Sequence, residues 1–421
     1  MKRILWAILA LVTSANAAYS QTCWTIGTDG SIELNPERIV LPYSDHIEMS
    51  GEQVSCVLRW MVDEKGLFGQ ERSLVFPMLR RVPNDTHASL LYRMGTDVMS
   101  LVGINSLVPK QLSTKKVSID GGLSVISEYG VGKANVGGAR GDNPKPVAEV
   151  RTTVFPSKVH PMLCEIYSIR NISASPLVLN VPKFSQEAKT LADNGVDGSY
   201  VIRADIFGSG TYVLEPWQEI GFQVAFQAYR EKGGSMIVPD FDAEYSARMS
   251  FIRDAIDSSL ILETPDTVIN TEFRFAKIRA SESIYRTKGG LMHGPGGESY
   301  YAALWCNDEC EYVNPFYPFL GYAVGNESAF NCYRLYSGFM NDDFKPVPSS
   351  IIAEGTDIWD GAGDRGDAAM IAHGLSRYLL ARGDKNEAEQ LWPFLKWCLE
   401  YCHRKLNAAG VPESDSDELE G

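Results

Sequence analysis

The chain has 421 residues, a net charge of −14 and 22% charged residues. Nucleic acids and anionic membranes bind basic surfaces, so this charge argues against both as partners. A hydrophobic content of 44% is ordinary for a folded protein, and the length allows two or three domains that each have a core.

The first residues, MKRILWAILALVTSANAAYSQ, have the pattern of a secretory signal. Lys2 and Arg3 form a positive start, residues 4–12 form an apolar segment too short to span a bilayer, and residues 15–17 (ANA) form a small-residue cleavage site. We expect a signal peptide over residues 1–17, cleavage after Ala17 or Ala18, and a secreted or periplasmic protein without a membrane span.

The eight cysteines are compatible with disulfides in an exported protein, although their pairing is left open. Cys306 and Cys310 are four residues apart, as are Cys398 and Cys402, which places each pair on one face of a helix. No second Cys/His pair with zinc-site spacing lies nearby, so we expect packed thiols and neither a metal nor a cofactor.

Residues 18–239 have the pattern of short strands separated by Gly, Pro and Asn. The segment IGFQVAFQAY alternates, which places Ile220, Phe222, Val224 and Phe226 on one face of a strand. Many such runs with Gly-rich connections predict an antiparallel β-sandwich.

The periodicity changes near Phe241, and the remaining chain has a mostly helical pattern. We expect a linker helix over residues 240–264 and a helical domain over residues 265–421. A stripe at Ile269, Phe273, Ala276, Ala280 and Ile284 predicts one helix. A second stripe predicts another, with Asp384 and Glu387 at its start and with Leu391, Leu395, Cys398, Cys402 and Leu406 on one face.

Three loops between the predicted helices are rich in aromatic and acidic side chains. Recognition of a sugar ring needs flat apolar faces and hydroxyl acceptors, and cleavage of a glycosidic bond needs two carboxyl groups. The first loop contains Tyr300, Tyr301, Trp305, Asp308, Glu309, Glu311 and Tyr312, the second contains Asp357, Trp359, Asp360, Asp364, Arg365 and Asp367, and the third is ESDSDELEG, Glu413 to Gly421.

These loops resemble those of the six-hairpin glycosidases, the group that contains glucoamylase and maltose phosphorylase. LWCNDECEYVNPFYPFLG is similar to their Trp-x-x-Asp loop, and WDGAGDRGDAAMIAHG is similar to the second sugar-binding loop of glucoamylase. SDSDELEG is similar to the loop that carries the general acid. The resemblance implies a β-sandwich, a linker helix and an (α/α)6 barrel.

The resemblance also implies roles for individual residues. Glu418 would be the general acid, with Asp417 as the close alternative. The residues expected to bind substrate are Trp305, Asp308, Glu309, Trp359, Asp364, Arg365 and Asp367. The implied function is an inverting glycoside hydrolase for a neutral oligo- or polysaccharide, with two carboxyl groups about 6.5–9.5 Å apart. The neighbouring acids would raise the pKa of Glu418.

An (α/α)6 barrel has twelve helices and needs well over ~200 residues at ordinary helix and loop lengths. The segment 265–421 is shorter, so we expect a partial barrel that ends before the general base, and little activity from this chain alone. Two alternatives stay open: a phosphorylase on the same scaffold, and a non-catalytic carbohydrate-binding protein. The sequence does not indicate the sugar, the linkage or the oligomeric state.

Overall fold

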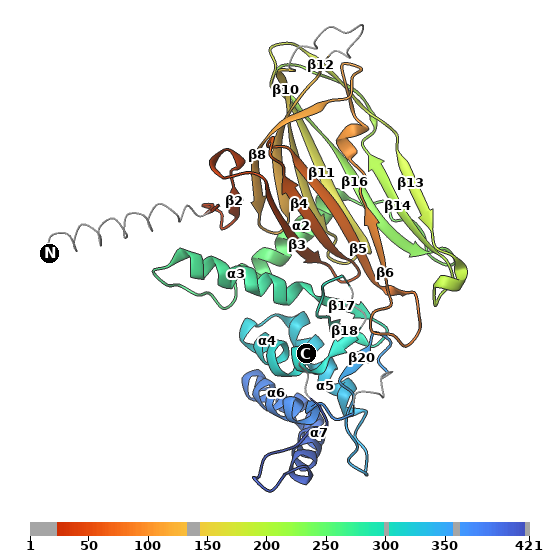
Figure 1. Ribbon diagram of the computed structural model, residues 1–421, viewed down its shortest axis with the longest axis vertical. Coiled ribbons are helices and arrows are strands. Elements are labelled where there is room, and N and C mark those ends of the chain that lie inside the picture. The colour runs from red at the N-terminus through yellow and green to blue at the C-terminus, as the bar shows by residue number, and fades with distance from the viewer. Residues whose placement is uncertain (1–22, 133–143, 299–302, 357–362, 417–421) are drawn as a thin grey trace, which may run out of the picture.

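The computed structural model describes residues 23–132, 144–298, 303–356 and 363–416, and Figure 1 shows its arrangement. The predicted signal peptide and the predicted acids Asp417 and Glu418 lie outside these residues, as does Trp359. Most of the strands are gathered in one part of the molecule, the helices α4 to α7 lie with a few short strands in another, and α2 and α3 lie at the junction (Figure 1). No described helix has the length and apolar character needed to cross a membrane.

The largest sheet has nine antiparallel strands in the order β1-β2-β8-β9-β10-β11-β16-β14-β13. Their bounds are β1 Trp24–Ile26, β2 Ile32–Leu34, β8 Lys110–Ile119, β9 Leu123–Gly130, β10 Pro146–Pro156, β11 Met162–Asn171, β16 Glu219–Arg230, β14 Tyr200–Phe207 and β13 Ser185–Lys189.

A four-stranded antiparallel sheet, β3-β4-β5-β6, packs against the first, and a three-stranded sheet, β15-β12-β7, completes the strand-rich part. Their bounds are β3 Tyr43–Ser50, β4 Ser55–Val62, β5 Phe68–Arg80, β6 Ser89–Met94, β7 Gly103–Ile104, β12 Leu177–Val181 and β15 Gly210–Leu214. Short 3-10 turns lie at Pro36–Arg38, Val98–Ser100 and Ala192–Asn194. The predicted antiparallel strands are confirmed.

The alternation predicted for β16 is confirmed, since Phe222, Val224 and Phe226 are buried in the core between the sheets. The opposite face of this strand is also partly covered, because Ala225 packs with Phe241 of helix α2. A strand between a sheet core and a helix therefore buries both of its faces along part of its length.

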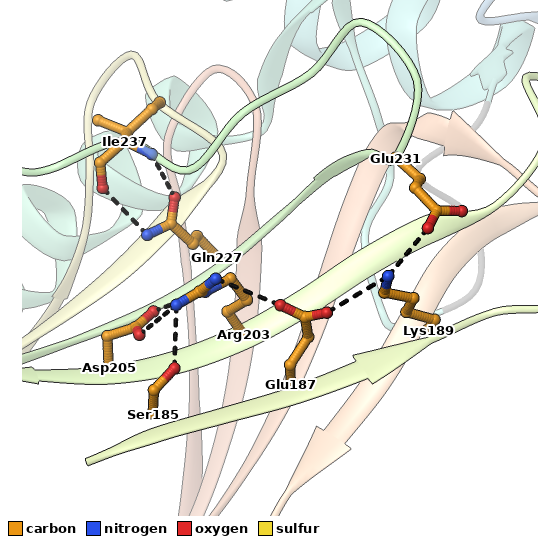
Figure 2. Close-up of polar contacts among 8 residues, drawn as sticks. All are labelled: Ser185, Glu187, Lys189, Arg203, Asp205, Gln227, Glu231 and Ile237. Atoms are coloured by element: carbon orange, nitrogen blue, oxygen red, sulfur yellow. Dashed lines mark hydrogen bonds and ion pairs between the residues drawn. The ribbon is translucent and has the colours of Figure 1, made fainter.

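Polar contacts hold the edge of the large sheet and the exit from it (Figure 2). Arg203 on β14 forms a two-pronged ion pair with Asp205 and also reaches Ser185 and Glu187 of the edge strand β13. The buried amide of Gln227 donates to the carbonyl of Ile237 at 3.1 Å and accepts from its N–H at 2.9 Å. This clamp fixes the chain between β16 and α2.

The helix predicted over residues 240–264 is shorter than expected. Helix α2 spans Phe241–Phe251 with Asp240 as its N-cap, a π-helical turn (η4) follows at Ile252–Asp257, and α3 spans Thr267–Glu282. The Lys277 ammonium group of α3 donates to the carbonyls of Ile256, Ser259 and Leu260. The carbonyl groups that end this helical segment therefore bond to a lysine instead of continuing a helix.

The helix predicted from the first stripe is present as α3, but the stripe does not form the buried face of α3. Its buried side chains are Lys277, Ile278, Ser281 and Glu282, while Ala276 is exposed and Ile284 begins strand β17. The stripe predicted for the last helix is buried over most of its length. Helix α7, Lys385–Arg404, has Asp384 as its N-cap and buries Leu391, Leu395 and Cys398.

The part after α3 is less helical than predicted, because short strands interrupt it. Its elements are β17 Ile284–Thr287, β18 Gly290–His293, β19 Ala303–Trp305, a π-helical segment (η5) Asn307–Val313, α4 Asn314–Leu320, α5 Ala323–Ser337, β20 Ser350–Ile352, α6 Asp367–Arg382 and α7. They enclose a second core that includes Leu304, Tyr333, Ile371, Leu375 and Phe394. The (α/α)6 arrangement is thus only partly evident in the described residues.

The guanidinium group of Arg248 joins the strands to the helices. This side chain of α2 is fully buried and donates to the carbonyl of Gly121 between β8 and β9, to the carbonyl of Ser50 at the end of β3, and to the carboxylate of Glu282 at the end of α3. Arg279 also pairs with Glu282, at 2.9 Å. One cation therefore holds four segments at the junction.

We predict that Arg248→Ala lowers the free energy of unfolding by about 3 kcal/mol, because it leaves carbonyls and part of a buried carboxylate unpaired. This is the lower end of the usual cost, since Glu282 keeps Arg279. Urea unfolding followed by circular dichroism measures the change. Arg253→Ala is the matched control, because the side chain of Arg253 is 67% exposed and pairs with its neighbour Asp254, and it should change stability by less than about 0.5 kcal/mol. Equal effects of the two substitutions would contradict the role of Arg248.

Candidate functional site

The first predicted loop begins where β19 ends. Trp305 lies opposite Ser350 of β20, and the N–H of Cys306 donates to the carbonyl of Ser349 at 2.8 Å. The chain then enters the π-helical segment η5, whose first turn contains Asp308 and Glu309. Such π-turns widen a helix locally and are frequent at functional sites.

Glu309 is completely buried and pairs with a histidine. Its Oε1 lies 2.8 Å from Nδ1 of His293, the last residue of β18, which is also buried. Burial raises the pKa of Glu309, while His293 acts in the opposite direction. The Oε2 atom of Glu309 is buried and has no hydrogen-bond partner among the described residues. Glu309 therefore contacts the protein interior, and through His293 it fixes η5 against the β17–β18 hairpin.

Asp308 differs from its neighbour because it is partly exposed. Burial raises its pKa above the ordinary value, and the nearby His293 lowers it to a smaller extent. A carboxyl group that is partly desolvated and still reachable is suited to hydrogen bonding with a ligand. The same loop contains a second aromatic side chain, Tyr312, which lies farther along η5 and is 66% exposed.

Trp305 is approached by a segment of the strand-rich part. The ring of His87, in the connection between β5 and β6, lies edge-on to the Trp305 ring at a centroid distance of 6.3 Å. Arg80 holds this connection in place, because it pairs with Glu354 after β20 at 2.9 Å and donates to the carbonyl of Asp85. The strand-rich part therefore contributes one wall beside Trp305.

Sequence reasoning missed both histidines, since neither stands in a recognisable motif. Their partners lie far away along the chain or on another element, so spacing gives no signal. The sequence shows only that the chain has six histidines, and nothing in it distinguishes His87 and His293 from the others as site residues.

The second predicted loop is tied to the first. Asp367 opens α6, is 1% exposed, and accepts a hydrogen bond from Oγ of Ser349 at 3.1 Å. The carbonyl of Asp367 lies 3.7 Å from Sγ of Cys306. Gly366 precedes the helix with φ +89°, a conformation that glycine adopts without strain. Arg365 is half-buried in the same loop.

The second loop is also tied to the third. Asp364 is 2% exposed; its N–H donates to Oδ2 of Asp415 at 3.1 Å, and its carbonyl accepts from the N–H of Asp415 at 2.7 Å. The hydroxyl of Tyr401 donates to Oδ2 of Asp364, and the ammonium group of Lys405 lies 3.4 Å from the same oxygen. Burial and the carboxylate together raise the pKa of Tyr401.

The three predicted loops therefore meet at one place in the helical part. Cys306 and Asp367 join the first loop to the second, and Asp364 and Asp415 join the second to the third. Of the predicted substrate-binding residues, Trp305, Asp308 and Arg365 are partly exposed, whereas Glu309, Asp364 and Asp367 are buried against protein groups. Trp359, Asp417 and Glu418 lie outside the described residues. Within the described residues, no three His, Cys, Asp or Glu side chains are grouped as metal ligands.

All eight cysteines fall within the described residues and are unpaired, and six of them are buried. The Sγ atoms of Cys310 and Cys332 are 4.0 Å apart in the second core. Burial raises the pKa of both Cys306 and Cys310. These thiols pack as small apolar groups, as the sequence predicts.

No protein family matches the chain, and no curated protein matches it. Among solved structures, a candidate kojibiose phosphorylase from the human microbiome is similar over 92% of this chain and 61% of its own, at 10% identity and a TM-score of 0.45. A bacterial glucoamylase in complex with acarbose is similar over 89% and 70%, at 8% identity and a TM-score of 0.28. A 4-alpha-glucanotransferase from Thermococcus litoralis is similar over 46% and 40%, at 11% identity and a TM-score of 0.22.

The chain spans 61% of the length of the kojibiose phosphorylase candidate.

We predict that Asp308→Asn stabilises the fold at neutral pH. The unfolded chain titrates Asp308 near 3.8, and burial raises its pKa in the folded protein. The folded state therefore holds this proton to a higher pH than the unfolded state, so stability falls as pH rises through that window and stays lower above it. Removing the charge should raise the urea midpoint at pH 7 and leave it nearly unchanged at pH 3.

The matched control for this prediction is Asp343→Asn, since the side chain of Asp343 is 74% exposed. It should change the midpoint little at either pH. An Asp308→Asn variant that is less stable than the parent at pH 7 would show that the carboxylate makes a favourable contact instead.

Proposed function

We propose that this chain is a carbohydrate-active protein that binds a neutral oligo- or polysaccharide where its three loops meet, and that it serves glycoside hydrolysis with inversion. The observation that supports the proposal most directly is the contact of the three loops through Cys306–Asp367 and Asp364–Asp415. The sequence marks these same loops as the ones that contain aromatic and acidic side chains.

In this proposal Trp305 and Asp308 hold one sugar ring. The indole face stacks on the apolar face of the ring, and the carboxylate of Asp308 accepts hydrogen bonds from its hydroxyls. The partial exposure of both side chains supports this role. His87 would border the ring from the strand-rich part, since it lies beside Trp305.

The buried acids have a different role in the proposal. Asp364 and Asp367 hold the second loop between the other two, and Glu309 orients η5 through His293. They are positioning residues, because their carboxylates face protein groups. Arg365 is the basic side chain of the second loop and would contact ring hydroxyls.

The chemical step is assigned to the third loop. Glu418, or Asp417 beside it, would donate a proton to the leaving glycosidic oxygen while a second carboxylate activates water on the opposite face of the ring. Hydrolysis of this kind needs no metal and no cofactor. The phosphorylase alternative replaces this water by phosphate, and Arg365 is the basic group of the second loop that could contact it.

Binding can be tested with isothermal titration of α-linked gluco-, manno- and rhamno-oligosaccharides. For whichever sugar binds, we predict that Asp308→Asn raises Kd about 10- to 150-fold, the usual value of a hydrogen bond to a charged group. Asp343→Asn, with its exposed carboxylate, should leave Kd unchanged. If the two substitutions have the same effect, Asp308 does not bind the sugar.

Turnover can be tested on the longest form of the protein that its gene encodes, with and without phosphate. We predict that Glu418→Gln lowers the rate about 10²- to 10⁴-fold, the usual contribution of a general acid, and that Asp417→Asn lowers it less. The reverse order would assign the acid to Asp417. A rate that depends on phosphate would favour the phosphorylase, and binding without products would favour a carbohydrate-binding protein.

A further inference from the structure

A cavity of about 410 Å³ lies between the two large sheets of the strand-rich part. Its walls come from β5 of the four-stranded sheet and from β8, β9, β10 and β11 of the nine-stranded sheet. The segment from Gly95 to Ser100, which contains the short helical turn Val98–Ser100, forms its rim. None of the predicted site residues lines it. It is therefore separate from the loops described above.

The floor of the cavity is a closed charge network. The buried guanidinium group of Arg72 pairs with both oxygens of Glu165 and donates to the carbonyl of Thr96. The hydroxyl of Tyr167 donates to the same carboxylate at 2.7 Å, and the amide of Gln70 does so at 3.2 Å. Since each charge is matched inside the protein, the floor offers an ionic ligand no unpaired counter-charge.

Three polar groups around this space have no such partner. The Oε1 atom of Gln70 is buried without a hydrogen bond. Within the residues that the structure describes, the hydroxyl groups of Tyr129 and Thr152 have no hydrogen-bond partner either, although both side chains line the cavity. Burial also raises the pKa of the Tyr129 hydroxyl. Tyr129 and Thr152 are half-buried, so their two hydroxyls and the buried acceptor of Gln70 can be reached by the hydroxyl groups of a ligand.

The remaining walls supply flat apolar surface. Phe68, Tyr129 and the ring of Tyr167, which stacks on Phe222 at 4.8 Å, face or border the cavity. The volume lies within the range of small-molecule pockets. Aromatic faces combined with hydroxyl and amide groups fit a ring that has apolar faces and hydroxyls at its edge.

We propose that this cavity is a binding site for a neutral hydroxylated ring, the chemistry shared by a free monosaccharide or cyclitol and the terminal residue of a longer glycan. Tyr129, Thr152 and Gln70 hold its hydroxyls, and the matched pair of Arg72 and Glu165 keeps charged analogues out. The inference is independent of the function proposed for the helical part, because no residue is shared between the two sites.

The test is saturation-transfer NMR and titration on the full chain with glucose, mannose, myo-inositol, maltotriose and glucuronate as probes. We expect binding of at least one neutral probe. A double variant, Tyr129→Phe with Thr152→Val, should weaken that binding at least tenfold. Monosaccharides bound more tightly than maltotriose would identify a free ring as the ligand, and the reverse order would identify a glycan end.

The matched control is Thr153→Val, which changes the same residue type one position along β10. Thr153 hydrogen-bonds with Ser124 and lines no part of this cavity. Binding in this control should equal that of the parent. Loss of binding in Asp308→Asn with retention in the double variant would place the sugar in the helical part and overturn the inference.

If the double variant does not fold, as judged by circular dichroism, Gln70→Ala, which removes the buried acceptor of the cavity, replaces it and should also weaken binding. Two other results overturn the inference. One is glucuronate binding as tightly as glucose, because it would show that the floor accepts charge. The other is no saturation transfer to any probe.

Discussion

The buried cation Arg248 is the constraint on which the arrangement of this protein depends. Its guanidinium group faces carbonyls from both large sheets and the carboxylate that ends α3. Two residues after that carboxylate, β17 begins, and the hydroxyl of Tyr285 on β17 returns to Oγ of Ser50 at 2.9 Å. At this point the strands and the helical part are therefore joined by polar contacts whose partners are removed from water. Such contacts are costly to break, because each one leaves a buried group unsatisfied.

A series of contacts that starts at this junction fixes the position of the candidate site. The β17–β18 hairpin ends at His293, and His293 holds the π-helical segment that contains Asp308 and Glu309. From there the contacts of Cys306 with Asp367, and of Asp364 with Asp415, join the remaining loops. Two neighbouring acids of this π-turn therefore differ in their surroundings. Glu309 is buried and positions the segment, while Asp308 is partly exposed.

The sequence correctly predicted those features of the fold that are determined by neighbouring residues. The alternation in β16 and the Asp384 cap of α7 are read directly from neighbouring residues, and both are confirmed. The length of α2 and the buried face of α3 were not predictable from the sequence. Lys277 and Arg248 have the character of surface residues, and only the structure shows that they are buried against a carbonyl and a carboxylate, respectively. The same holds for the site. Composition indicated the three loops, whereas the roles of His293 and His87 depend on contacts between distant segments.

The distribution of charge bears on which chemistry this protein can perform. Arg72, Arg80 and Arg248 are fully buried, and each is matched by a carboxylate, from Glu165, Glu354 and Glu282 respectively. These cations are used to hold the structure and add nothing to an anion-binding surface, while the chain as a whole has a charge of −14. A phosphate ion would have to approach against that field, and near the loops the ammonium group of Lys405 already lies 3.4 Å from a carboxylate oxygen of Asp364. Water and neutral sugars encounter no such barrier, so the charge distribution supports the hydrolytic form of the proposal over phosphorolysis.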